Sequence, residues 1–375
     1  MRGRIILVAL AILLAAFMMG AVASTSWLTS FGDRPRGARL ERVRKSPHFV
    51  DGKFVNAVPT NKLAPGSLFA MLRHQFFCDE ERVPKRPIPI VMHDAADYAT
   101  GPASGLRATW IGHASTLVEI DGRHVVTDPI WSQRCSPSTW VGPKRFHPPP
   151  VSLDALPAID VAVISHDHYD HLDMATVQAL AARGTRFAVP LGVGAHLEVW
   201  GIAPDQITEL DWNETADLAG LKVTATPARH YSGRNPLRGD GTLWASWVVK
   251  GPVHNFFFSG DSGYFDGFKE IGARHGPFDL ALVKIGACDV TWPDIHMTPE
   301  EAVQVTGDVG GKLLMPVHWG TFNLAFHAWN DPADRVFAAA QVAGTALVVP
   351  RPGELIEPDR IAASPRPATP DFWWR

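Results

Sequence analysis

Beyond Gly105 the chain alternates short apolar runs with polar turns, a pattern typical of β-strands. These runs occupy residues 107–112, 115–128, 160–166, 186–190, 221–227, 243–251, 254–261, 280–286 and 312–320. Asp121-Gly122 divides the second run and predicts a two-residue hairpin turn. Segments 174–183 and 299–309 have helical patterns and lie between strands. We therefore predict an α/β domain over residues 106–357, with two β-sheets packed face to face and helices outside them.

The first residues carry a different pattern, in which Arg2 and Arg4 precede an apolar run from Ile5 to Ala23. This pattern predicts an export signal, and the small residues Ala21 and Ala23 fit cleavage as a signal peptide. As a helix the run would also span about 28 Å, which suits a retained membrane anchor. Both alternatives stay open for residues 1–23. Either one places the remaining chain in the periplasm or on the inner membrane of a bacterial-type cell envelope.

The segments on either side of the predicted domain have little periodicity. Residues 24–105 are rich in Pro, Arg and Gly and predict an irregular N-terminal extension. The basic run from Arg34 to Lys45 is either a solvated linker or a contact for anionic lipid head groups. Residues 358–375 form a predicted C-terminal tail. Its final aromatic residues, Phe372 to Trp374, would dip into a membrane interface or cap an apolar patch of the domain.

Composition and charge narrow the function classes. The 375 residues are 46% hydrophobic, enough for a large core. The net charge of -3 gives no overall basic field, so we expect no nucleic-acid partner. There are 16 histidines but only three cysteines, which lie far apart at Cys78, Cys135 and Cys288. This spacing favours neither a disulfide framework nor a thiolate zinc ribbon, so any metal is expected on imidazole and carboxylate ligands.

The densest group of such ligands follows the apolar run 161–164. Within six residues the chain places His166, His168, Asp170 and His171. Residues at i and i+2 share a face of an extended chain, so His166 and His168 can converge on one metal. The turn beyond them lets Asp170 and His171 reach a second. Imidazole and carboxylate at this density suit zinc, with iron or manganese as weaker alternatives.

Two metals need further ligands, and the ends of later predicted strands supply candidates. His230 follows residues 221–229, Asp261 follows the apolar segment 254–260, and His318 follows residues 312–317. A single polar residue at a strand end is usually a surface or capping residue. Three of them in a chain that already holds the first group favour a shared metal centre.

The HxHxDH motif of His166, His168, Asp170 and His171 resembles the metallo-β-lactamase superfamily. The resemblance implies the four-layer αβ/βα sandwich of that superfamily and two Zn²⁺ ions per chain. It implies that one zinc is bound by His166, His168 and His230. The other would be bound by Asp170, His171 and His318, with Asp261 bridging the two ions.

A more extensive likeness covers most of residues 107–322 and is to the N-acyl-phosphatidylethanolamine-hydrolysing phospholipase D branch. The similar stretches include TWIGHASTLVEID, TDPIWSQRCSPSTWVGPKRF, GDSGYFDGFKEIGARHGPFDLALVKIGA and PVHWGTF. The resemblance implies a phosphodiesterase of phospholipase D type with lipid substrates, membrane association and a possible homodimer. The alternative is a hydrolase of small soluble esters, lactones or sugar phosphates at the same binuclear site.

The expected nucleophile is a hydroxide bridging the zinc ions, because bound zinc lowers the pKa of water to about 7. Asp170 would orient it and accept its proton. The resemblance implies that His296 donates a proton or polarises a substrate oxygen, and a helix-capping neighbour without a role is the alternative. Ser262 lies in Gly-Asp-Ser-Gly, which is not the GxSxG form of a nucleophile elbow, so we do not assign it.

Other residues near these segments have weaker assignments. His113 and Asp128 end early strands and are expected to orient metal ligands, with an ordinary turn as the alternative. Lys144 and Arg145 would bind a substrate phosphate or form a solvated loop pair. Core packing or an aromatic-rimmed groove for an acyl chain would explain four tryptophans, Trp131, Trp140, Trp292 and Trp319.

Overall fold

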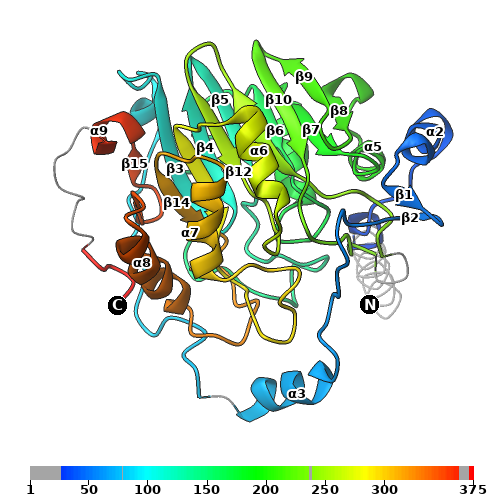
Figure 1. Ribbon diagram of the computed structural model, residues 1–375. Helices are drawn as coiled ribbons and strands as arrows, with labels where there is room; N and C mark the ends of the chain where they lie inside the picture. The colour runs from blue at the N-terminus through cyan, green and yellow to red at the C-terminus, as the bar shows by residue number, and fades with distance from the viewer. Residues whose placement is uncertain (1–26, 78, 236–238, 363–370) are drawn as a thin grey trace, which may run out of the picture.

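The computed structural model describes residues 27–77, 79–235, 239–362 and 371–375, and two large β-sheets form its centre (Figure 1). One sheet contains β3 (Leu106–Gly112), β4 (Ser115–Ile120), β5 (Arg123–Thr127), β6 (Val161–Val163), β7 (Arg186–Pro190), β8 (Ile207–Leu210) and β15 (Leu355–Ile356). Its strand order is β15-β3-β4-β5-β6-β7-β8. The other contains β9 (Thr215–Leu218), β10 (Leu221–Thr226), β11 (Ser246–Lys250), β12 (Asn255–Phe258), β13 (Leu280–Lys284) and β14 (Leu314–Val317), in the order β14-β13-β12-β11-β10-β9.

Helices cover the outer faces of both sheets. The seven-stranded sheet packs against α4 (Met174–Ala182) and α5 (Gly194–Val199). The six-stranded sheet packs against α6 (Gly267–His275), α7 (Pro299–Asp308) and α8 (Asp331–Ala343). A short α9 (Pro358–Ala362) follows β15. The four-layer αβ/βα sandwich predicted from the sequence is thus confirmed.

The apolar runs are long because both faces of each sheet are buried. In β5, Val125 belongs to the core cluster that includes the space between the sheets, whereas Val126 belongs to the cluster under α4 and α5. Successive side chains of a strand point to opposite faces, so a strand buried on both sides reads as continuously apolar. The predicted hairpin turn at Asp121-Gly122 joins β4 and β5, and Asp121 has a positive φ of 49°.

The N-terminal extension is more ordered than the sequence predicted. It contains α2 (Gly37–Lys45), β1 (Phe49–Val50), β2 (Lys53–Phe54), α3 (Ser67–Phe77) and the 3₁₀ helix η1 (Ala95–Tyr98), and a further 3₁₀ helix, η2 (Pro204–Gln206), precedes β8. In α2, Val43 is buried in the main core and Arg39 forms ion pairs with Glu198 and Glu209. These partners lie more than 150 residues away along the chain, so local periodicity could not reveal the helix.

The C-terminal aromatics pack on the domain. Trp374 is fully buried, and its Nε1 donates a hydrogen bond to Asp334 Oδ1 of α8 at 2.9 Å. The Trp373 ring lies 5.3 Å from that of Trp319. Of the two alternatives predicted for this tail, the described residues 371–375 show the cap on an apolar patch.

The predicted signal peptide or anchor at residues 1–23 lies outside the described residues. Within the described ranges, no helix has both the length and the apolar character needed to cross a membrane.

Candidate metal centre

The seven residues predicted to bind metal come together at the ends of four strands. His166, His168, Asp170 and His171 lie in the loop after β6, and His230, Asp261 and His318 follow β10, β12 and β14. The carboxyl ends of β12, β13 and β14 meet at one edge because these strands are parallel. Possible ligand atoms of these residues form several groups within 4.8 Å of one another. Folding therefore builds one centre from segments that are up to 152 residues apart.

One part of the centre, the triple-histidine half, consists of His166, His168 and His230. His168 Nδ1 lies 2.9 Å from His166 Nε2 and 3.3 Å from His230 Nε2. His230 Nδ1 donates to the carbonyl of Ile295 at 2.9 Å, so its Nε2 lone pair faces the other two rings. His166 Nδ1 lies 2.8 Å from Ser165 Oγ. Such outer hydrogen bonds fix the rings with one nitrogen available for a metal.

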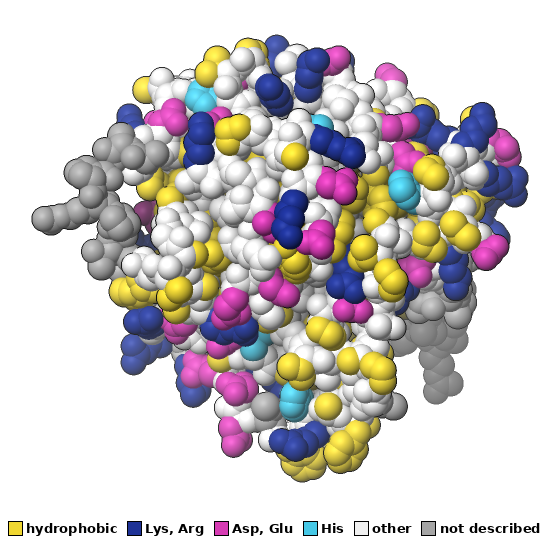
Figure 2. All heavy atoms as spheres, viewed as in Figure 1, with side chains coloured by type: hydrophobic (Ala, Val, Ile, Leu, Met, Phe, Trp, Pro, Cys, Tyr) yellow, Lys and Arg dark blue, Asp and Glu magenta, His cyan; other side chains and the backbone are white. Residues whose placement is uncertain are grey.

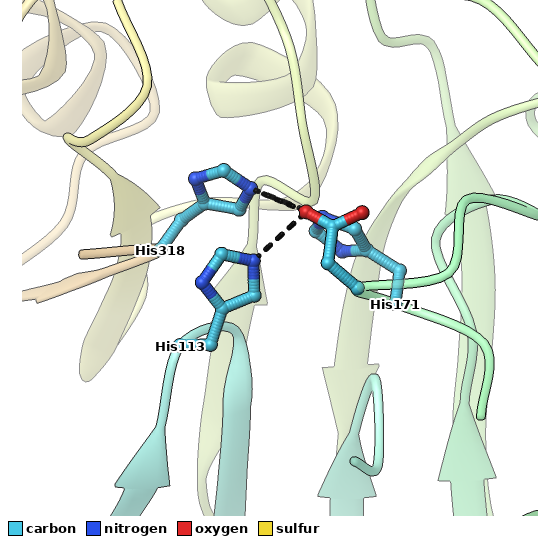
Figure 3. Close-up of side chains that lie close together, drawn as sticks. His113, His171 and His318 are labelled. Carbon is cyan, nitrogen blue, oxygen red and sulfur yellow. Dashed lines mark hydrogen bonds and ion pairs between the residues drawn. The ribbon is translucent and has the colours of Figure 1, made fainter. Parts of the chain in front are cut away.

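The other part, the carboxylate half, consists of Asp170, His171 and His318. Asp170 Oδ2 lies 3.3 Å from His171 Nε2 and 3.4 Å from His318 Nε2, and the two Nε2 atoms are 3.1 Å apart. Asp170 Oδ2 also lies 3.0 Å from Nε2 of His113, on the β3–β4 turn. Figure 3 shows His113 and His318 turned toward the same carboxylate oxygen, with His171 beside it.

Asp261 lies between the two halves. Its Oδ2 is 3.0 Å from His318 Nε2, 3.3 Å from His171 Nε2 and 3.9 Å from His230 Nε2. Its Oδ1 is buried and lacks a hydrogen-bond partner in the described part of the chain. A buried carboxylate oxygen without a partner is costly, and a cation at this position would remove that cost. The donor set therefore fits a pair of metal ions bridged by this carboxylate.

The charge states of the two halves differ. Burial holds the pKa of His166 and His168 below the ordinary value and lowers the pKa of His230 to about 3, so the triple-histidine half is neutral. Burial alone would also lower the pKa of His171. The carboxylates of Asp261 and Asp170 nevertheless raise it well above its usual value.

Asp128 holds the loop that carries both halves. It is fully buried and accepts hydrogen bonds at 2.6 Å from His171 Nδ1, the Ser165 hydroxyl and the Ser165 backbone N–H. Because Ser165 Oγ donates to Asp128, it accepts from His166 Nδ1. Asp128 thus orients His171 directly and His166 through Ser165, which agrees with the ligand-orienting role predicted for it.

Three polar residues at strand ends have left-handed backbone conformations. The φ angles are 54° for His113, 32° for Asp128 and 63° for His318. Non-glycine residues adopt such angles at a cost of about 1–3 kcal/mol, and they persist where surrounding structure fixes them. The backbone strain is therefore located at residues whose side chains form or orient the carboxylate half.

His296 reaches the centre from the loop before α7. Its Nδ1 lies 3.8 Å from Asp261 Oδ2, and its ring centroid is 5.1 Å from that of His230. This nitrogen is buried without a hydrogen-bond partner among the described residues. Burial and the positive charge of Lys284 hold the pKa of His296 well below its usual value, so the imidazole is neutral.

Both predictions for Arg145 are wrong, because the side chain is a buried structural group. It donates to the carbonyls of Ile130 at 2.9 Å, Ile111 at 3.1 Å and His147 at 3.2 Å. Its neighbour Lys144 is exposed. An arginine that satisfies three carbonyls under the loop cannot also face a substrate phosphate.

The four tryptophans have different environments. Trp319 is buried and stacks on Trp110 at 5.3 Å, and Trp131 donates to the carbonyl of Val151. Trp292 packs against Phe326 at 5.5 Å. Trp140 is almost fully exposed. Core packing therefore explains some of this group and leaves Trp140 without an explanation in the core.

Sequence reasoning missed two residues beside the centre. Lys284 ends the otherwise apolar β13, is fully buried, and donates to the Met297 carbonyl at 3.2 Å. Burial lowers its pKa to about 8. The Tyr231 ring lies 4.5 Å from that of His168. A lysine at the end of an apolar strand was the available signal for the first, whereas Tyr231 gave none beyond its position after His230.

A pocket opens beside the carboxylate half. His113 and His318 belong to its wall together with residues from four other segments of the chain: Arg82, Phe146, residues 286–287, and eight residues between Trp319 and Trp329. The centre is thus reached from the side of His113 and His318.

Residues 123–319, just over half of the chain, match the family described as Beta-lactamase superfamily domain. The chain belongs to the metallo-β-lactamase superfamily. The match includes all seven predicted metal ligands and ends directly after His318. Like other metallo-β-lactamase-fold hydrolases, the protein is a metal-dependent hydrolase.

Individual relatives place it within the superfamily. The chain is 47% identical to an uncharacterised protein of Mycobacterium tuberculosis, across 97% of this chain and 99% of that protein. It is 37% identical to N-acyl-phosphatidylethanolamine-hydrolyzing phospholipase D 1 of Caenorhabditis elegans, across 70% of this chain and 77% of that protein. A metallo hydrolase from Ignicoccus hospitalis shares the fold, with a TM-score of 0.52, 24% identity and coverage of 67% of this chain and 97% of that one.

Proposed function

We propose that this superfamily member is a binuclear zinc phosphodiesterase of phospholipase D type that acts on N-acyl-phosphatidylethanolamine-like lipids. The observation that carries the proposal is the position of Asp261 between the two halves, within 3.9 Å of His171, His318 and His230, with a buried Oδ1 that lacks a protein partner among the described residues. A set of ligands made up of imidazole and carboxylate groups is suited to zinc. The 37% identity to a phospholipase D with this lipid in its name supports the substrate class.

The chain's own residues supply orientation and charge. When bound, the metal pair would supply an activated water and positive charge facing the phosphoryl group. The histidines around Asp170 hold the pKa of its carboxylate well below the usual value despite burial, so it is anionic and can accept a hydrogen bond that orients a water molecule. Asp128 and Ser165 keep His171 and His166 oriented toward the centre.

His296 fits the polarising role better than the acid role. A neutral imidazole can donate a hydrogen bond to a substrate oxygen, but it lacks the extra proton of a general acid. We therefore expect His296→Gln to keep both metals and lower kcat by about tenfold to a hundredfold. An unchanged kcat would leave His296 as a packing residue, whereas loss of one metal would make it a ligand.

The deciding experiment measures metal content together with hydrolysis of N-acyl-phosphatidylethanolamine in mixed micelles. We expect two zinc ions per chain, and a loss of turnover of about a thousandfold in Asp170→Asn, because several kcal/mol of transition-state stabilisation are removed. Asp205→Asn, an exposed aspartate in η2, is the matched control. If the protein binds two zinc ions but hydrolyses only soluble esters or lactones, these compounds replace lipids as the proposed substrate class. Absence of metal would overturn the proposal.

We also place the enzyme outside the cytosol, in the periplasm or on the inner membrane, on the basis of the apolar run from Ile5 to Ala23 after two arginines. Fractionation of cells that express the full chain would test this. Recovery in the cytosolic fraction with an intact N-terminus would contradict it.

A further inference from the structure

Helix α3 exposes apolar side chains that nothing in the described chain covers. It projects from the lower edge of the molecule in Figure 1, and Figure 2 shows hydrophobic atoms gathered in the same region. Phe69, Leu72 and Phe77 are 78%, 51% and 83% exposed. A short helix gains most of its stability from burying an apolar face, so a helix that exposes several large apolar residues indicates an interaction surface.

Packing contacts tie this helix to the wall of the metal-centre pocket. His74 of α3 packs against the Phe326 ring at 5.5 Å, and the guanidinium of Arg82 lies 5.0 Å from the centre of that ring. Ser67 at the start of α3 donates to the Thr291 carbonyl at 3.1 Å. Arg82 lines the pocket that includes His113. The exposed face of α3 therefore lies next to the entrance of the site.

A second apolar projection adjoins the same pocket. A β-bridge between Arg134 and Lys144 closes a loop, residues 134–144, whose far end presents Trp140 and Val141. These two side chains are 86% and 68% exposed. At the base of the loop Cys135 packs with Ile130 and Phe322, and Phe322 belongs to the pocket wall. The loop thus carries aromatic and aliphatic groups at its tip and two basic residues at its base.

The first described residues reach the same edge. Phe31 contacts Trp27 at 5.2 Å and Tyr169, next to the ligands His168 and Asp170, at 6.5 Å. The Ser30 hydroxyl lies 3.3 Å from the carbonyl of Pro137 in the 134–144 loop. The apolar sequence from Ile5 to Ala23 ends shortly before Trp27. A chain held in a membrane by that run would bring this edge, with the metal centre, toward the lipid.

We propose that α3 and the 134–144 loop form a docking surface for a phospholipid bilayer beside the entrance of the metal centre. The assignment of lipid rather than a second copy of the chain rests on charge. Arg134 and Lys144 stand behind the apolar tip, where basic groups meet phosphate head groups while aromatic and aliphatic groups enter the acyl boundary. This surface rests on the proposed function and deepens it, since it would deliver a membrane lipid to the site.

A site-specific probe tests the surface without relying on catalysis. In the full chain with Cys78→Ser, single variants Val141→Cys and Leu72→Cys are labelled with nitrobenzoxadiazole, while Cys135 and Cys288 are buried. The control is Val253→Cys, 77% exposed in the turn between β11 and β12, at the end of β12 opposite to Asp261. Vesicles of phosphatidylethanolamine and phosphatidylglycerol should shift the emission of the first two probes to the blue and leave the control unchanged.

Several results would overturn the proposal. The first is an unchanged emission at positions 141 and 72 in protein that floats with the vesicles, and the second is an equal shift at position 253. A blue shift that rises with protein concentration in the absence of vesicles would assign the surface to a second copy of the chain. The labels report insertion even if the protein hydrolyses no lipid, so a failure of the proposed function is distinguished from a failure of the surface.

A kinetic comparison provides an independent check. The triple variant Leu72→Ser/Trp140→Ser/Val141→Ser removes three exposed apolar groups that touch no metal ligand. We expect its turnover of vesicle-embedded lipid to fall about tenfold through a higher apparent KM. Hydrolysis of bis(p-nitrophenyl) phosphate, a soluble phosphodiester, should not change. Val253→Ser/Val342→Ser is the matched control, and equal losses on both substrates would contradict a docking role.

Discussion

The two halves of the metal centre use the same kinds of ligand in different surroundings. The triple-histidine half is neutral because burial lowers the pKa values of its histidines. In the carboxylate half, Asp170 and Asp128 flank His171, whose pKa is raised. Among the residues that line the adjacent pocket, His113 and His318 belong to the carboxylate side, and none belongs to the triple-histidine half.

This difference indicates a division of labour. The triple-histidine half offers neutral, preoriented nitrogens and contributes no residue to the wall of that pocket. The carboxylate half contains an anionic carboxylate, Asp170, and a proton on His171 that a metal must displace. It also adjoins the pocket. Under the proposed function, a substrate phosphate would approach from the carboxylate half, where the metal charge faces the pocket.

The largest expected effect comes from the residue that joins the halves. Asp261→Asn should reduce metal content in both halves and lower hydrolysis by about a thousandfold or more, because an amide cannot supply the bridging charge. Metal analysis and turnover on the same preparation would measure this. Retention of two metals with normal turnover would show that the halves are independent.

Substitution of the residues that orient the ligands should have a smaller effect, and a different one on each half. Asp128→Asn should weaken metal binding by about tenfold to a hundredfold, chiefly at His171, which Asp128 contacts directly. Ser165→Ala removes the partner of His166 Nδ1 and one of the three hydrogen bonds that Asp128 accepts, and should weaken mainly the triple-histidine half. Equal effects of the two variants on both metals would contradict the distinction. Stepwise metal titration resolves the two sites.

The metal affinities of the two halves should depend differently on pH. In the metal-free protein His171 is protonated at neutral pH because its pKa is raised, so a metal must displace that proton. Affinity of the carboxylate half should therefore rise about tenfold per pH unit until the pH passes the pKa of His171, and fall as the pH drops. The triple-histidine half is already deprotonated and should respond little near neutrality.

Calorimetric titration in two buffers with different ionisation enthalpies measures this proton release. His168→Gln, which retains the carboxylate half, should release about one proton per metal bound. His318→Gln, which retains the triple-histidine half, should release almost none. Similar release from both variants would remove the electrostatic contrast between the halves.

The smallest effect should be confined to the triple-histidine half. A Cβ at Gly233 would lie 2.9 Å from His168 Nε2, so Gly233→Ala should displace that imidazole slightly. We expect a loss of metal affinity of a few-fold to about tenfold at this half alone. Gly101→Ala, at a position with open space around the added carbon and, as at Gly233, no positive φ, is the matched control. A loss at the carboxylate half in the Gly233 variant would contradict the prediction.

The sequence by itself determined the layered α/β class and the identity of the candidate ligands. Strands buried on both faces leave continuous apolar runs, and polar residues that follow such runs stand at strand ends. The order of residues along the chain was therefore enough to assign His166, Asp261 and His318 to one centre. The hairpin at Asp121-Gly122 could also be predicted, because a tight turn depends mainly on the residues within it.

Only the tertiary structure decided which residues surround the candidate ligands and how the flanking segments pack. It placed His113 against Asp170, buried Arg145 under three carbonyls, ordered α2 through acidic partners far along the chain, and packed Trp374 into the core. It also brought α3 beside the pocket. Each of these depends on contacts between distant segments, and the free energy of burial that fixes them leaves no local period in the sequence.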